Sequence, residues 1–160
     1  MLHLYIHQPD DARIPGINAW FSTEFNRHNT WFEQGKHWVD YLRRCQHMLQ
    51  QGKYAADVCY FIGEDVPKMT GARIPELPAG YSYDYINAEV ILNRLSVSKG
   101  KFVLPDGMSY SLLVLPPMHT MRPEVLRKIE ALVQAGGAVL GPRPGKSPSL
   151  ENSPECDEEV

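Results

Sequence analysis

The feature that most constrains the fold is an alternation of strand and helix patterns between residues 56 and 141. Residues 56–62, ADVCYFI, form a nearly continuous apolar run of strand length, which is typical of a parallel strand covered on both faces. Further buried strands are predicted within residues 111–116, SLLVLP, and at residues 138–141, AVLG. Strands that alternate with helices build a parallel sheet through right-handed crossovers. The sequence therefore predicts an α/β fold with a flavodoxin-like, or Rossmann-like, three-layer plan and a β-hairpin insertion.

Helix and turn signals separate these strands. A long Pro/Gly-rich connection is expected over residues 63–85, after which Asn87 or Asp84 can cap a helix. The pair Asp106-Gly107 lies between two apolar segments and predicts a β-hairpin. Pro123, at a first-turn position, opens another helix that Gly136-Gly137 closes. The apolar positions expected on the two helices are Ile86, Val90, Ile91 and Leu95 on the first, and Val125, Ile129, Leu132 and Val133 on the second.

The segment before the sheet has a different organisation. Residues 2–6, LHLYI, predict a short buried strand that runs into a long polar loop. A helix is expected over residues 31–51, because Thr30 and Glu33 have the spacing of a capping box and Gly52 can end the helix. An opening strand without neighbours, and a tail SPECDEEV that resembles a helix start with no helix after it, suggest truncation at both ends. We expect domains at 1–52 and 53–160. The apolar face expected on the helix is Trp38, Leu42, Cys45 and Leu49, with Tyr41 and Met48 beside it.

Charge and motifs exclude several classes of function. A net charge of -3 without a Lys/Arg-rich run argues against nucleic acid as a partner. No apolar run is long enough to span a membrane, and the first residues lack the pattern of a signal peptide. The turn Gly63-Glu64-Asp65 after the first strand carries two carboxylates that would repel a phosphate, so we expect no nucleotide site. No Ser or Cys stands on the elbow motif of a nucleophile.

The cysteines and most histidines predict no special chemistry. Three cysteines with wide spacing and no CxxC pair fit neither a disulfide framework nor a zinc site. Cys45 falls on a helix face and Cys59 within a strand, so both are expected to be buried and unreactive. The scattered histidines expected to be ordinary surface or half-buried residues are His3, His37, His47 and His119.

One loop concentrates polar and aromatic side chains. Residues 23–34, TEFNRHNTWFEQ, combine carboxylate, guanidinium, imidazole and amide groups with aromatic rings directly before the predicted helix. Rings stack on the C–H faces of sugars while such polar groups bind hydroxyls, so this mixture favours a carbohydrate site. The alternative is that Trp20, Phe25 and Trp31 only pack the loop on the helix while Glu24 pairs with Arg27. The candidate substrate-binding residues are His7, Trp20, Glu24, Asn26, Arg27, His28 and Trp31.

The chain resembles the glycoside hydrolase family 106 α-L-rhamnosidases. The residues that carry the resemblance are HQP at 7–9 and the segments 15–65, 83–97, 104–117 and 141–150. The resemblance implies a (β/α)8-type catalytic barrel followed by a flavodoxin-like accessory domain. Residues 2–6 and 31–51 would be the last strand and helix of that barrel, and residues 7–30 would be its last βα loop, at the end where such barrels form their active sites.

The resemblance also implies inverting hydrolysis of terminal α-L-rhamnosides with a bound calcium. Inversion needs two carboxyl groups roughly 6.5–9.5 Å apart, which one loop can hardly supply. In the family this position varies, and many relatives carry His and Asp where Glu24 and Asn26 stand, so Glu24 is not assigned as catalytic. The acid and the base are expected on earlier barrel strands, so no catalytic residue is assigned in this chain. The chain alone is expected to be inactive and to need no cofactor, with calcium only in the parent enzyme. The parent would be a periplasmic or extracellular bacterial protein, and the partners would be its carbohydrate substrate and the missing barrel segments.

A free-standing flavodoxin-like binding or interaction module is the alternative. It would pack the helix at 31–51 onto the parallel sheet as one closed core. The rhamnosidase-like reading instead predicts that the apolar face of this helix is exposed in the isolated chain.

Overall fold

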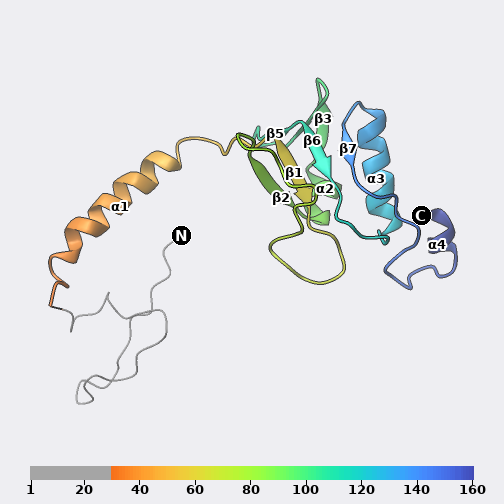
Figure 1. Ribbon diagram of the computed structural model, residues 1–160, viewed down its shortest axis with the longest axis horizontal. Helices are drawn as coiled ribbons and strands as arrows, with labels where there is room; N and C mark the ends of the chain where they lie inside the picture. The colour runs from red at the N-terminus through yellow and green to blue at the C-terminus, as the bar shows by residue number, and fades with distance from the viewer. Residues whose placement is uncertain (1–29) are drawn as a thin grey trace, which may run out of the picture. The chain divides into compact units, whose positions relative to one another are not determined.

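The structure is a computed structural model that describes residues 30–160 (Figure 1). The chain divides into two compact units, Met1–Gly52 and Lys53–Val160. Within the described part, no helix has the length and apolar character needed to cross a membrane. The strand predicted at residues 2–6 lies outside the described residues.

Helix α1 (Gly35–Leu49) belongs to the first unit and begins later than predicted. Residues 30–34 form turns. The amides of Lys36 and His37 bond to carbonyls three positions back, as in a 3₁₀ helix, so regular α-helical hydrogen bonding begins only after them. The residue that precedes the helix is Gln34, and no side chain caps it. The capping box predicted at Thr30 and Glu33 is therefore wrong as the start of this helix.

A four-stranded parallel sheet organises the second unit. Its order is β2 (Tyr83–Ile86), β1 (Val58–Phe61), β6 (Leu112–Val114) and β7 (Val139–Leu140). All three pairings are parallel, and β1 lies between β2 and β6 with every residue buried. The predicted parallel sheet and the buried strand within residues 56–62 are confirmed.

Strand β2 was not predicted. Its residues were assigned to the long connection, and Ile86 was assigned to the following helix, but Ile86 ends the strand and pairs with Phe61. Helix α2 (Ala88–Asn93) begins after Asn87, whose side-chain oxygen accepts a hydrogen bond from the Val90 amide at 3.0 Å. Asn87 is thus the cap, while Asp84 lies within the strand.

A small antiparallel sheet forms the predicted hairpin insertion. It contains β3 (Ser96–Ser98), β4 (Lys101–Val103) and β5 (Ser109–Tyr110). The Asp106-Gly107 turn joins β4 to β5, and Gly107 adopts a φ of +90° that glycine tolerates well. A second turn, at Lys99-Gly100, joins β3 to β4 and was not predicted. Ser111 alone separates β5 from β6 of the parallel sheet.

Helix α3 (Pro123–Gln134) begins with proline at its first turn and ends before Gly136, as predicted. Val125, Ile129 and Leu132 are buried, but Val133 is 46% exposed because it lies beside the buried stripe rather than in it. A short helix α4 (Glu155–Glu159) forms in the tail, where no helix was expected.

The two faces of the parallel sheet are covered differently. Cys59 and Phe61 of β1 join the main core with apolar residues of α2, α3 and the antiparallel sheet. Val58 and Tyr60 point to the opposite face, where a smaller cluster includes Leu77 of the long connection and no helical residue. Within residues 53–160, helices therefore pack on one face of the sheet, and an irregular loop occupies the place of a second helical layer.

Candidate functional site

Most of the residues predicted to bind sugar lie outside the described part of the chain. These are His7, Trp20, Glu24, Asn26, Arg27 and His28. Trp31 lies in the turn before α1 and is 37% exposed. Its ring passes close to Gly35, where an added Cβ would come within 3.1 Å of the Trp31 Cζ3 atom. The glycine therefore leaves room for the indole to lie against the start of the helix with part of its surface open.

Helix α1 carries an apolar face that is largely exposed. Trp38 is 44% exposed, Tyr41 55% and Leu49 79%, while Leu42 and Cys45 are half-buried. These positions recur at the spacing of three and four residues that places them on one side of a helix.

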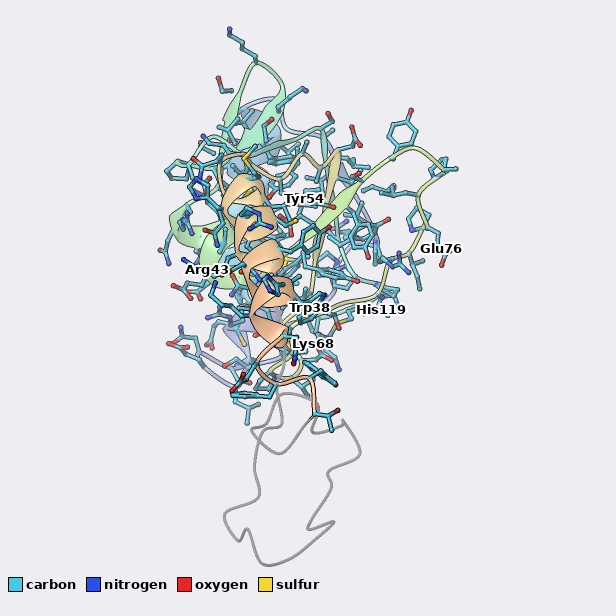
Figure 2. All side chains as sticks on the ribbon, turned by 90° about the vertical axis from the view of Figure 1, so that its left-hand side faces the viewer. Trp38, Arg43, Tyr54, Lys68, Glu76 and His119 are labelled. Atoms are coloured by element: carbon cyan, nitrogen blue, oxygen red, sulfur yellow. The ribbon has the colours of Figure 1, made fainter. Side chains whose placement is uncertain are left out.

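The opposite side of α1 is charged. Lys36 and Arg43 both pair with Asp40, and the hydrogen bond from Lys36 lowers the pKa of that carboxyl. Figure 2 shows Arg43 and Trp38 extending to different sides of the helix. The helix is therefore amphipathic, with a charged face and an exposed apolar face.

The carboxyl edge of the parallel sheet is where ligands bind in many α/β proteins, at the point where strand order reverses. Here that point lies between β1 and β6, and Glu64 is the third residue after the end of β1. The Glu64 carboxylate accepts a hydrogen bond from the Arg122 amide at 3.1 Å and from Arg122 Nε at 2.5 Å. Arg122 is the residue before α3, and its bond with Glu64 raises its pKa. A carboxylate of the chain itself thus occupies the helix N-terminus at which a phosphate would bind.

The thiols show no sign of a nucleophile. Cys59 is completely buried in β1, and burial raises the pKa of its thiol to about 12, with a further rise from the nearby Asp84 carboxylate. The predicted burial of Cys59 is confirmed, and a thiol with this pKa stays protonated at neutral pH. Cys45 is only half-buried.

Metal-ligating side chains do not gather in the described residues. Within residues 30–160, no group of three His, Cys, Asp or Glu side chains could hold a metal ion. His37, His47 and His119 are exposed surface residues, as predicted. His3 lies outside the described residues.

Comparison with known proteins connects these features to one family. Residues 1–160 match the family model described as alpha-L-rhamnosidase. The chain is 47% identical over 162 residues to a protein of Formosa agariphila described as "Putative beta-glucuronidase", a match that covers 100% of this chain and 14% of that protein.

A solved rhamnosidase structure from Novosphingobium sp. PP1Y is also similar, with a TM-score of 0.74 and 33% identity over 97% of this chain and 15% of that one. The chain thus spans 14–15% of the length of these two relatives. Because the family model matches from the first residue to the last, the chain belongs to glycoside hydrolase family 106, the family of the α-L-rhamnosidases.

Proposed function

We propose that the chain is part of a glycoside hydrolase that acts on terminal α-L-rhamnose or related sugars of plant or microbial glycans. The observation that carries this proposal is the similarity to a rhamnosidase structure along 97% of the chain. The relative described as a glucuronidase is the reason for keeping related sugars in the proposal. Such glycans lie outside the cell, so we place the parent enzyme in the periplasm or the extracellular medium of a bacterium.

Within that enzyme, residues 1–52 would contribute the last strand and helix of a (β/α)8-type barrel, and residues 53–160 a flavodoxin-like accessory domain. Two features support this division. The compact units meet between Gly52 and Lys53, and the sheet order β2-β1-β6-β7 has the reversal point of a flavodoxin-like sheet. The exposed apolar face of α1 is where the neighbouring barrel elements would pack.

The loop of residues 7–30 would then form one wall of the sugar pocket, because the active sites of such barrels lie in the loops at the carboxyl ends of their strands. Trp31 would offer its partly exposed ring to the C–H face of a sugar. The acid and the base of an inverting reaction would come from other parts of the enzyme, roughly 6.5–9.5 Å apart. No three His, Cys, Asp or Glu side chains gather within residues 30–160, so a calcium ion of the parent enzyme would draw most of its carboxylate ligands from other parts of that enzyme.

A free-standing binding module is the second candidate. It would be expected to pack the apolar face of α1 onto the parallel sheet. The match of the family model to the whole chain, and the small share of two longer relatives that the chain covers, favour the rhamnosidase-like proposal.

A segment exchange tests the proposal. The matching segment of the Novosphingobium rhamnosidase would be replaced by this chain, and hydrolysis of a chromogenic α-L-rhamnoside would be measured. We expect the chimera to turn over the rhamnoside, while the purified 160-residue chain alone does not.

In the chimera, Trp31→Ala should lower kcat/KM about two- to tenfold, the value of one aromatic stacking contact. Tyr81→Ala, at an exposed ring in the second unit, is the matched control and should change little. A folded chimera that cleaves neither a rhamnoside nor a glucuronide, or in which Trp31→Ala has no larger effect than Tyr81→Ala, would contradict the proposal.

A further inference from the structure

Tyrosines gather beside the edge strand β2, on the face of the sheet that carries no helix of the second unit. The rings of Tyr83 and Tyr85 meet edge to face with centroids 5.4 Å apart, and Tyr83 meets Tyr60 in the same way at 5.8 Å. Tyr54 donates its hydroxyl to the Tyr83 carbonyl at 3.1 Å and is 58% exposed. Buried Tyr60 forms the floor and donates its hydroxyl to the Pro75 carbonyl at 2.5 Å.

Two charged side chains of the long connection join these rings. The Arg73 guanidinium carbon lies 4.9 Å from the centroid of Tyr83, and Arg73 and Glu76 are both exposed. The bond from the Tyr60 hydroxyl to the Pro75 carbonyl brings Glu76, the next residue, toward the same rings. Burial raises the pKa of Tyr60, the Arg73 charge lowers it and the Glu76 charge raises it. We call the group Tyr54, Arg73, Glu76, Tyr83 and Tyr85 the tyrosine surface. In Figure 2, Tyr54 lies beside the strands, while Glu76 lies at the outer side of the long connection.

Arg73 and Glu76 differ from the other charges of the same connection. Lys68 and Asp65 form an ion pair at 2.5 Å. By contrast, neither Arg73 nor Glu76 forms an ion pair with any residue of the described chain, although the two are three positions apart in sequence. Arg73 is instead fixed against a ring by a cation–π contact. The surface therefore keeps a guanidinium donor and a carboxylate acceptor available next to half-exposed rings.

We propose that the tyrosine surface is an accessory carbohydrate-binding site that takes a pyranose ring of a glycan chain. The Tyr85 ring would contact C–H groups, the Arg73 guanidinium would donate to a hydroxyl oxygen, and the Glu76 carboxylate would accept from a neighbouring hydroxyl. Tyrosine and arginine are also enriched in protein interfaces, but glutamate is depleted from them, so the Glu76 carboxylate beside the rings favours a sugar over a protein partner. The site lies wholly within Lys53–Val160 and does not depend on the proposed pocket loop.

The test is an NMR titration of the 160-residue chain with a soluble rhamnose-containing trisaccharide. We expect amide signals of residues 73–86 to shift with a dissociation constant in the millimolar range. Arg73→Ala should weaken binding about tenfold, the size of a charge-assisted hydrogen bond. Arg143→Ala, an exposed arginine elsewhere in the same unit, is the matched control and should leave binding unchanged.

Trp31→Ala separates this site from the proposed pocket. If the shifts fall on residues 7–31, and Trp31→Ala abolishes binding while Arg73→Ala does not, the tyrosine surface is not a sugar site and the pocket proposal gains support. Absence of any titration at about 10 mM trisaccharide overturns the inference and leaves the rhamnoside assay unaffected. Shifts of residues 73–86 that follow protein concentration instead of sugar would identify a protein contact and also overturn it. The amide spectrum of each variant reports whether it is folded.

Discussion

Replacing Glu64 by glutamine should destabilise the second unit by about 1–2 kcal/mol. The Glu64 side chain is only 10% exposed and accepts two hydrogen bonds from Arg122 at the start of α3. A hydrogen bond to a charged group contributes about 1.5–3 kcal/mol, and a negative charge at a helix N-terminus adds about 0.3–1 kcal/mol. Two effects reduce the loss. The glutamine oxygen still accepts one bond, and Arg122 is 38% exposed, so solvent screens the pair.

Glu124→Gln is the matched control. Glu124 also pairs with Arg122, but its side chain is 48% exposed, so removing the same charge should cost less than about 0.5 kcal/mol. A double-mutant cycle with Arg122→Gln should return a coupling energy of about 1 kcal/mol for the Glu64 pair.

The assay must report on the second unit. All three tryptophans precede residue 53, so tryptophan fluorescence would follow the first unit only. Urea unfolding should therefore be followed by far-ultraviolet circular dichroism, with hydrogen exchange of α3 amides as a second probe. If Glu64→Gln costs no more than Glu124→Gln, or if the coupling energy is zero, Glu64 does not hold the start of α3 in the way described.

Three further predictions concern the core. Tyr110→Phe removes the 2.9 Å bond from the Tyr110 hydroxyl to Asp84 between the two sheets, and should lower the free energy of unfolding by about 1–2 kcal/mol in urea; no change would show that the bond is dispensable. Gly137→Ala places a Cβ 2.7 Å from the Phe102 ring and should cost about 1–3 kcal/mol by thermal unfolding, with a neutral result contradicting the close packing. Cys59, protonated below its raised pKa of about 12, should resist alkylation of the native chain at pH 8 while the half-buried thiol of α1 reacts, and equal rates in mass spectrometry would contradict its burial.

The sequence predicted the elements whose signals come from the backbone itself. Asp106-Gly107 and Pro123 specify φ values that few other structures accept, and the hairpin and α3 form where these residues stand. The run around Cys59 predicted a buried parallel strand because it is short and almost continuously apolar, as strands covered on both faces are.

Elements that are stabilised by residues far away in the sequence could not be predicted from local signals. Strand β2 is polar at Asp84 and aromatic on either side of it, which resembles a loop until β1 provides its ladder partners. Thr30 and Glu33 have the residue types of a capping box, but the turns at residues 30–34 keep the helix from starting there. The hydrogen bond between Arg122 and Glu64 could not be predicted either, because the two residues are 58 positions apart in sequence.

For the candidate site, sequence reasoning supplied the residue types of the loop, and the structure adds the position of Trp31 beside Gly35. The tyrosine surface was missed because its members come from separate segments. The signal that could have found it is the repeat of tyrosine at positions 81, 83 and 85, which places the last two on one side of a strand.

The pairing of β1 with both β2 and β6 also has a consequence during synthesis on the ribosome. Val58 in β1 pairs with Tyr83 in β2 and with Leu112 in β6, and both of these partners are synthesised after it. At about 5–20 residues per second, roughly 3–10 s pass before the second neighbour is made. During that interval the wholly apolar strand of the nascent chain is open to chaperones and to other unfinished chains, so production of this domain should respond to growth temperature and to the rate of translation.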